Sequence, residues 1–173
     1  MMNRVLIFSV LMAALCALAS AGCPEGYTQR DWPDQHGNCY KLFKNAALWF
    51  HADHFCRADG GWLATIRDEG DSAFVNSFFI SNRGYSCHDW YWVGGTDALN
   101  EGTWRWQQDG SVANYVNWGA GEPNNYGPGD EDGLIVNSAT RQWNDDRIFG
   151  TGAPAVCFVC EMYPTERQCS IVS

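Results

Sequence analysis

The 173-residue sequence predicts an α+β domain in which the helices and the strands are segregated along the chain. Three observations lead to this prediction. Two segments with helical spacing of apolar residues come first, short apolar runs typical of strands follow, and a long stretch rich in Gly and Pro interrupts those runs. The length suits one domain, and a hydrophobic fraction of 46% is sufficient for a core.

The first helix is predicted over residues 45–59. Its apolar residues recur at steps of three and four, which places them on one helical face: Leu48, Trp49, Ala52, Phe55 and Cys56. Gly60-Gly61 ends it, because glycine is common directly after a helix. A second helix is predicted to follow Asp71 as its N-cap and to stop at 82–84. Its buried stripe is Phe74, Val75, Phe78 and Phe79.

Four short runs predict strands: Tyr91–Gly94, Trp104–Trp106, Leu134–Val136 and Val156–Met162. The stretch from about 107 to 131 shows no such pattern and is predicted to be a long loop. An irregular segment of that length is usually either functional or disordered. Six tryptophans are expected in the core: Trp49, Trp62, Trp92, Trp104, Trp106 and Trp118.

The first 21 residues are typical of a secretory signal peptide. Arg4 precedes an apolar run, Val5–Leu18, and the small residues Ala19-Ser20-Ala21 form a cleavage pattern. A membrane anchor is the alternative, but the run is shorter than the roughly 20 residues that a span needs. We therefore predict a signal peptide over 1–21, one domain over 22–163, a C-terminal tail over 164–173, and a secreted, extracellular protein with no membrane insertion.

Charge and cysteine content narrow the class further. The formal net charge of -9 argues against nucleic acid or an anionic membrane surface as a partner. Seven cysteines remain after the predicted leader: Cys23, Cys39, Cys56, Cys87, Cys157, Cys160 and Cys169. In an oxidising compartment most of these are expected to form disulfides, with one left over. Zinc at Cys157 and Cys160 is disfavoured because no second such pair exists.

The segment 117–146 concentrates negative charge in the predicted loop. It holds six carboxylates against one base, Arg141: Glu122, Asp130, Glu131, Asp132, Asp145 and Asp146. Carboxylates packed together remain ionised only if a positive charge lies among them. The segment has no Cys or His, and carboxylate and amide oxygens are ligands that Ca²⁺ prefers. The pattern favours a Ca²⁺ site; the alternative is a solvated acidic loop.

An ordered set of motifs resembles the C-type lectin domain. Glu122-Pro123-Asn124, Glu131-Asp132 and Trp143-Asn144-Asp145 resemble its sugar-binding calcium site. Residues 23–40 resemble the N-terminal extension of the family's long form, and residues 49–64 resemble its first helix and the segment that follows. Residues 92–95 resemble the core strand motif, and Cys160-Glu161 resembles the end of the domain. The resemblance covers about residues 23 to 162 and implies a C-type lectin-like fold: two helices, short antiparallel sheets and a long calcium-binding loop.

The resemblance also implies ligands for Ca²⁺. The principal metal and sugar site would consist of Glu122, Asn124, Glu131, Asn144 and Asp145. Asp130 is the alternative to Glu131, because the acidic block is one residue longer than in many relatives. Asp145 would give both a side-chain and a backbone oxygen, and Pro123 would follow a cis peptide bond. A second, weaker calcium site would use Asp97, Glu101, Asn125, Glu131 and Asp132.

The order Glu-Pro-Asn goes, in this family, with mannose-type sugars. The resemblance therefore implies a glycan partner with equatorial 3- and 4-hydroxyls, such as mannose, N-acetylglucosamine, glucose or fucose. Recognition of microbial or self glycans is the role that such binding would suit. The second reading is a lectin-like domain with structural calcium that binds protein, mineral or ice. An enzyme is not expected: calcium would hold Glu122 and Asp145 ionised and leave no acid, and no nucleophile motif is present.

Disulfide pairing follows in part from the resemblance, which implies Cys23–Cys39 and Cys56–Cys160. The family's second invariant bridge is missing, because Gly133 and Gly150 stand at its two places. Of the extra cysteines, Cys87–Cys157 is favoured, which leaves Cys169 free to bridge to another copy of the chain. Cys87–Cys169 is the alternative that the sequence leaves open.

Overall fold

A computed structural model describes residues 22–30, 37–126 and 130–165. The described chain divides into two units. The larger unit is Tyr40–Met162, and the smaller unit consists of the described residues before and after it. The predicted signal peptide (1–21) and most of the predicted tail, including Cys169, lie outside the described residues. Within the described ranges, no helix has the length and hydropathy needed to cross a membrane.

The smaller unit is held by one disulfide and one pair of backbone hydrogen bonds. Cys23 is bonded to Cys39, as the resemblance implies. Gly22 and Thr165 form an antiparallel bridge with N···O distances of 3.1 and 3.0 Å. A short strand, β1 (Thr28–Gln29), lies in the same unit. The bridge brings Thr165, which the sequence assigns to the tail, beside the first residue after the predicted leader.

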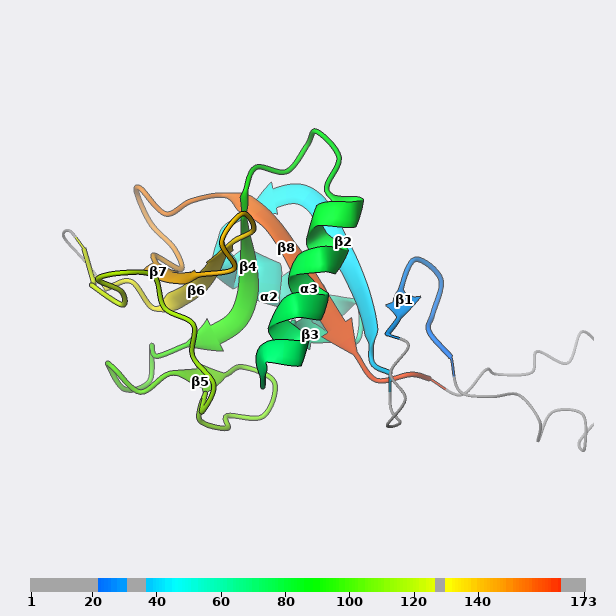
Figure 1. Cartoon of the computed structure of the whole chain (residues 1–173), viewed down its shortest axis with the longest axis horizontal. Coiled ribbons are helices and arrows are strands. Elements are labelled where there is room, and N and C mark those ends of the chain that lie inside the picture. The colour runs from blue at the N-terminus through cyan, green and yellow to red at the C-terminus, as the bar shows by residue number, and fades with distance from the viewer. Residues whose placement is uncertain (1–21, 31–36, 127–129, 166–173) are drawn as a thin grey trace, which may run out of the picture. The chain divides into compact units, whose positions relative to one another are not determined.

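The larger unit combines two helices with a sheet (Figure 1). Along the chain the elements are β2 (Cys39–Ala47), α2 (Trp49–Ala58), β3 (Trp62–Leu63), α3 (Glu69–Asn82), β4 (Trp90–Thr96), β5 (Arg105–Trp106), β6 (Gly133–Asn137), β7 (Trp143–Asp146) and β8 (Val156–Met162). In the sheet the order is β2-β8-β4-β6-β7, with β3 on β8 and β5 on β4. This arrangement confirms the predicted fold class.

The sheet is mixed, which corrects the expectation of antiparallel pairing alone. β4 runs parallel to β8, with Tyr91 opposite Cys157 and Trp92 opposite Phe158. The other pairings of β4, with β5 and β6, are antiparallel. The parallel pair arises because β8, the last strand of the chain, lies between β2 and β4. The sequence did not predict it, because the periodicity of apolar residues does not show strand direction.

The two helices cover opposite faces of the sheet (Figure 1). Val75 and Phe79 of α3 are fully buried against a core that includes Val159 of β8. Phe55 of α2 stacks near Phe158, the preceding residue of β8. Successive residues of a strand point to opposite faces, so α2 and α3 lie on different sides.

Both helix starts differ from the sequence prediction. The first helix begins at Trp49, not Asn45, because residues 45–47 complete strand β2. The second begins at Glu69, and its N-cap is Asp68, not Asp71: the Asp68 carboxylate accepts a hydrogen bond of 2.7 Å from the Asp71 N–H. Asp71 is instead buried in the first turn, where its carboxylate accepts from the N–H of Arg67.

Most of the predicted core is confirmed, although Phe74 and Phe78 of the second helix are only partly buried. Trp49, Trp62, Trp92, Trp104 and Trp106 are buried, and Trp118 is partly buried with its ring 4.8 Å from that of Trp104. Phe55, however, is 51% exposed, so the buried face of α2 is narrower than its apolar spacing suggests.

The disulfides of the larger unit tie its sheet to flanking segments. Cys160 is bonded to Cys56 of α2, and Cys157 is bonded to Cys87 in the loop before β4. The second pair confirms the favoured alternative over Cys87–Cys169. The two β8 cysteines are three residues apart, so they reach partners on opposite faces of the sheet.

A candidate calcium and sugar site

The principal predicted site lies where the long loop meets strand β7. Two backbone hydrogen bonds of 2.8 Å fix the base of this loop: Gly119 donates to the Trp143 carbonyl, and Trp143 donates to the Asn117 carbonyl. Strand β7 itself was missed from the sequence, because its four residues, Trp143–Asp146, are mostly polar. Its pairing with β6, with Leu134 opposite Asp145, makes the Trp-Asn-Asp motif part of the sheet.

The carboxylate of Asp145 organises the Glu-Pro-Asn turn. Asp145 is only 2% exposed, and its two oxygens accept hydrogen bonds from the N–H groups of Asn124 (3.0 Å each) and Asn125 (2.8 Å). The Glu122–Pro123 peptide bond is cis, and the Asn124 amide donates a hydrogen bond to the Glu122 carboxylate. Three of the five predicted ligands, Glu122, Asn124 and Asp145, therefore lie together.

The remaining two predicted ligands make local contacts. A Glu131 carboxylate oxygen accepts a hydrogen bond from the Tyr126 N–H at 2.8 Å, and the Asn125 side-chain oxygen accepts one from the Glu131 N–H at 2.6 Å. The Asn144 amide donates to the backbone oxygen of Asp145 at 2.6 Å. That oxygen is the one the resemblance assigns to the metal. Each carbonyl or carboxylate oxygen has two lone pairs, so an oxygen that accepts one hydrogen bond keeps a second lone pair that could bind a cation.

Negative charge accumulates at this site. Burial, together with the hydrogen bond and the charge of Asp145, raises the pKa of Glu122. Burial and the charges of Asp145 and Asp146 raise the pKa of Glu131, although the Tyr126 N–H and Arg147 oppose the shift. A cation at this place would reverse both effects, because opposite charge favours the ionised carboxylate.

The second predicted site brings together three carboxylates. Ligand atoms of Asp97, Glu101 and Asp132 all lie within 4.8 Å of one another. Asp97 follows β4 directly, is 3% exposed, and has one oxygen held at 2.9 Å by the Gly102 N–H. Its other oxygen, Oδ1, is buried and has no hydrogen-bond partner among the described residues.

The electrostatics of this cluster also indicate a cation site. Burial and the charges of Glu101 and Asp132 raise the pKa of Asp97 to about 6, against the bond from Gly102. Burial and the charges of Asp130 and Glu101 raise the pKa of Asp132. An all-oxygen donor set with an unpartnered buried oxygen fits a hard cation such as Ca²⁺. The other two predicted ligands of this site, Asn125 and Glu131, make different contacts. The Asn125 side-chain oxygen accepts a hydrogen bond from the Glu131 N–H, and the Glu131 carboxylate accepts one from the Tyr126 N–H.

Comparison with known proteins identifies the family. The family model described as "Lectin C-type domain" matches residues 45–161. The chain belongs to the C-type lectin family. This lectin is 32% identical over 140 residues to "Perlucin-like protein" of Mytilus galloprovincialis, a match that covers 80% of this chain and 84% of that one. It is 30% identical over 166 residues to "C-type lectin lectoxin-Lio1" of Erythrolamprus poecilogyrus, covering 91% and 93%.

Solved structures agree with this assignment. The cow carbohydrate-recognition domain of CD23, crystallised in the presence of a GlcNAc2Man3 oligosaccharide, is 25% identical, with a TM-score of 0.68 that covers 84% of this lectin and 99% of that chain. The mouse scavenger receptor C-type lectin domain is 26% identical, with a TM-score of 0.68 and coverage of 83% and 100%.

Gly133, one of the two places where the resemblance implies a missing cysteine, is closely packed. A Cβ added at Gly133 would lie 2.7 Å from Cγ2 of Ile148 and 3.2 Å from a ring carbon of Trp49. Ile148 is buried, and its carbonyl accepts a hydrogen bond from Phe50 of α2. In this lectin, Ile148 therefore takes the space beside β6 and holds the chain after β7 against α2.

Two residues beside the site, Asp146 and Arg147, are half-buried. Burial raises the pKa of Asp146, while Arg147 opposes the shift. The Arg147 guanidinium donates to the Thr151 carbonyl at 3.1 Å, and its positive charge also acts on Glu131. The signal in the sequence was the position itself: Asp146 and Arg147 continue directly from the Trp-Asn-Asp motif.

Proposed function

We propose that this C-type lectin is secreted and binds, in a calcium-dependent manner, sugars with neighbouring equatorial 3- and 4-hydroxyls. This class includes mannose, N-acetylglucosamine, glucose and fucose. One observation carries the proposal: the Glu122 carboxylate and the Asn124 amide form an ordered acceptor–donor pair on a turn that the Asp145 carboxylate holds in place.

The chemistry of the site follows from its donor set. Glu122, Asn124, Glu131, Asn144 and Asp145 would hold Ca²⁺, and the ion would supply coordination to two sugar hydroxyls. The Glu122 carboxylate would accept a hydrogen bond from one sugar hydroxyl, and the Asn124 amide would donate a hydrogen bond to a hydroxyl oxygen. Glu131 and Asn144 offer the matching carboxylate and amide. Asp145 positions the turn, because it engages the backbone of Asn124 and Asn125 rather than their side chains.

The second carboxylate cluster, Asp97, Glu101 and Asp132, is proposed to bind a structural calcium ion. Asp132 directly follows Glu131, so neutralising this cluster would also stabilise the segment that carries a ligand of the principal site. Asn125 in place of a carboxylate lowers the negative charge offered to that ion, which predicts weaker binding there than at the principal site.

A single exposed site of this kind binds sugar weakly, with a Kd on the order of 1 mM. Useful avidity requires several sites on one particle. Cys169, the one cysteine of the predicted mature chain that the three disulfides do not use, is proposed to link copies of the chain. Such a multivalent secreted lectin would suit recognition of dense glycan arrays, as on microbial surfaces.

The test is retention of the mature protein on mannose–agarose in Ca²⁺, followed by elution with a chelator. Retention and chelator release are expected. A galactose–agarose column is a necessary second arm, because one relative, 31% identical over 131 residues, is named "Galactose-specific lectin nattectin". Retention on galactose alone would contradict the assigned sugar class while keeping calcium-dependent sugar binding.

The structural neighbours also include proteins that are not named as lectins. The fold matches human lithostathine at 26% identity with a TM-score of 0.67, and a calcium-independent type II antifreeze protein at 21% with 0.63, the latter a likeness of fold alone. The alternative is thus a domain with structural calcium that binds protein, mineral or ice. Calcium binding without retention on either column would favour it.

A further inference from the structure

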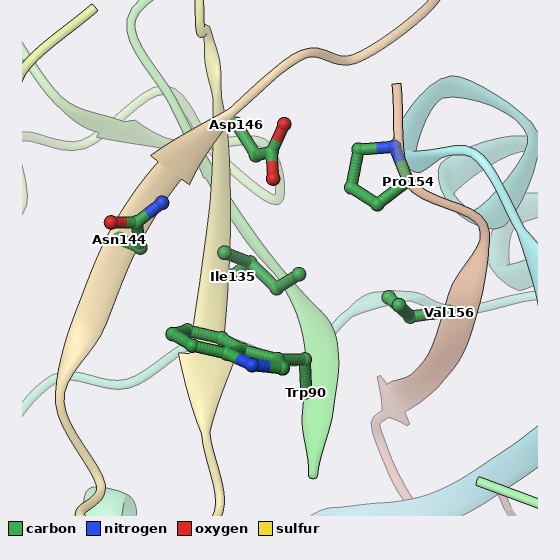
Figure 2. A pocket seen from close by; sticks show the side chains of 6 residues that line it. All are labelled: Trp90, Ile135, Asn144, Asp146, Pro154 and Val156. Atoms are coloured by element: carbon green, nitrogen blue, oxygen red, sulfur yellow. The ribbon is translucent and has the colours of Figure 1, made fainter. Parts of the chain in front are cut away.

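A cavity of about 140 Å³ lies on the face of the sheet that carries Asn144 (Figure 2). Its lining comes from four strands or their flanks: Trp90, Ile135, Asn144, Asp146, Pro154 and Val156. None of these residues except Asn144 belongs to the predicted calcium sites.

The cavity shares one residue, Asn144, with the proposed sugar site. Ile135 pairs with Asn144, so their side chains share one face of the sheet, and Asp146, two residues on, shares it too. Asp145 points to the other face, where it holds the Glu-Pro-Asn turn. Because β7 is the last strand of the sheet, the two faces meet at its edge. Asn144 is therefore common to the proposed sugar site and to the cavity.

The lining is amphipathic in a way that suits a sugar ring. Trp90, Ile135, Pro154 and Val156 form an apolar surface, and Trp90 is 36% exposed, so part of its indole is available for contact. Asn144 and Asp146 add an amide and a carboxylate at one end, as Figure 2 shows. A pyranose likewise has an apolar C–H face and a rim of hydroxyls, which can stack on an aromatic ring and hydrogen-bond at the edge.

The volume of the cavity suits one sugar ring. An apolar cavity of roughly 150 Å³ is known to bind benzene, whereas drug-sized ligands occupy pockets of about 300–1,000 Å³. Charge limits it further, because the Asp146 carboxylate faces the cavity and the chain has a formal net charge of -9. An acidic sugar is therefore disfavoured.

We propose that this cavity is a subsite for a second, neutral sugar ring, glycosidically linked to the calcium-bound sugar. The ring stacks on Trp90, and one of its hydroxyls donates a hydrogen bond to the Asp146 carboxylate. This inference rests on the proposed function, and it specifies the ligand: a neutral oligosaccharide is bound more tightly than its terminal monosaccharide.

The test compares binding of methyl α-mannoside with that of α1,2-, α1,3- and α1,6-linked mannobiose in Ca²⁺ by isothermal titration. At least one mannobiose is expected to bind about 5- to 10-fold tighter than the monosaccharide. In Trp90→Ala this ratio should fall to near one. Tyr85→Ala, which removes a fully exposed aromatic ring that does not line the cavity, should keep the wild-type ratio.

A second variant guards against a folding defect in Trp90→Ala. Val156→Phe keeps the indole and fills the cavity, so it should also abolish the disaccharide advantage. In addition, the indole N–H resonance of Trp90 should shift with mannobiose and not with methyl α-mannoside.

The outcomes separate the two proposals. If methyl α-mannoside binds but no mannobiose binds tighter, or if both variants keep the advantage, the subsite is wrong while the lectin function stands. If p-nitrophenyl mannoside binds more tightly than methyl α-mannoside and no mannobiose does, the cavity binds an apolar aglycone. That result would overturn the assignment to a second sugar. If neither sugar type binds, the proposed function fails, and the subsite fails with it.

Discussion

The buried carboxylate of Asp145 accepts a hydrogen bond of 2.8 Å from the backbone N–H of Asn125. The same carboxylate accepts a hydrogen bond from the N–H of Asn124. A side chain of strand β7 therefore binds the backbone of the Glu-Pro-Asn turn. This contact uses only protein atoms. Asp145 therefore links strand β7 directly to the backbone of the turn.

Asp145→Asn should weaken the protein even without calcium. An amide offers one acceptor oxygen in place of two, so at least one buried N–H loses a charged partner, at a cost of about 1–3 kcal/mol. Denaturant unfolding in chelator would measure this loss, and mannose–agarose retention in Ca²⁺ should disappear as well. Asp109→Asn, at an exposed turn, is the matched control. Unchanged stability in chelator would mean that this link contributes nothing without metal.

Asp97 should make the metal-free protein lose stability as pH rises. Its pKa is about 6 in the fold and near 4 in an unfolded chain, so the folded state binds the proton more tightly. The stabilising contribution is therefore complete below about pH 4 and is lost as pH rises through about 6, by on the order of 2 kcal/mol. Unfolding in chelator from pH 4 to 8 measures it.

The variant Asp97→Asn provides the control for this titration. It removes the charge, so it should flatten the pH dependence in chelator and reduce calcium binding at the second site. Calcium affinity of the wild type should rise over the same pH window, because the ion competes with the proton. An Asp97→Asn protein with the wild-type pH profile would show that another group titrates there.

Gly133→Ala should destabilise the fold by about 1–3 kcal/mol, because its Cβ would lie 2.7 Å from Ile148 in a packed region. Gly119→Ala, whose Cβ would have no contact under 3.4 Å, should change the free energy of unfolding by less than about 0.5 kcal/mol. Thermal unfolding of both variants makes the comparison. Adding Ile148→Ala to Gly133→Ala should relieve the overlap, so the double variant should lose less stability than the two single losses added together. If the losses simply add, the contact with Ile148 is not the cause.

Exchanging the order of acceptor and donor should change sugar choice. The double variant Glu122→Gln and Asn124→Asp presents an amide first and a carboxylate second, the order that in the family goes with galactose. The main-chain bond from residue 124 to Asp145 does not involve the exchanged side chain, so the fold should persist. Retention should move from mannose–agarose to galactose–agarose, with the wild type run on both columns. Loss of retention on both, in a folded protein, would count against the ordered pair as the determinant.

Cys169→Ser should convert disulfide-linked oligomers of the secreted protein to monomers. Non-reducing electrophoresis and light scattering would measure this, and avidity for a mannose-coated surface should fall without a change in affinity for free sugar. A wild-type protein that runs as a monomer without reductant would remove Cys169 from the proposal.

Local signals in the sequence were enough for the elements with strong patterns. Apolar spacing predicted both helices, and short apolar runs predicted β4, β6 and β8. The predicted starts of both helices were wrong, because contacts with neighbouring segments set them. Asn45 looks compatible with a helix, but pairing of β2 in the sheet extends that strand to Ala47. Asp71 looks like a cap, but Asp68 caps the helix and Asp71 is buried.

The sequence by itself determined the kinds of ligand atom and their order, because Glu-Pro-Asn and Trp-Asn-Asp are short motifs whose chemistry is local. Only the tertiary structure decided what these motifs touch. Hydrogen bonds between the turn and β7, the convergence of Asp97 with Asp132, and the packing of Ile148 on Gly133 all join residues far apart in the chain. Such contacts depend on strand register and on the volume left between elements, and neither is set by spacing along the sequence.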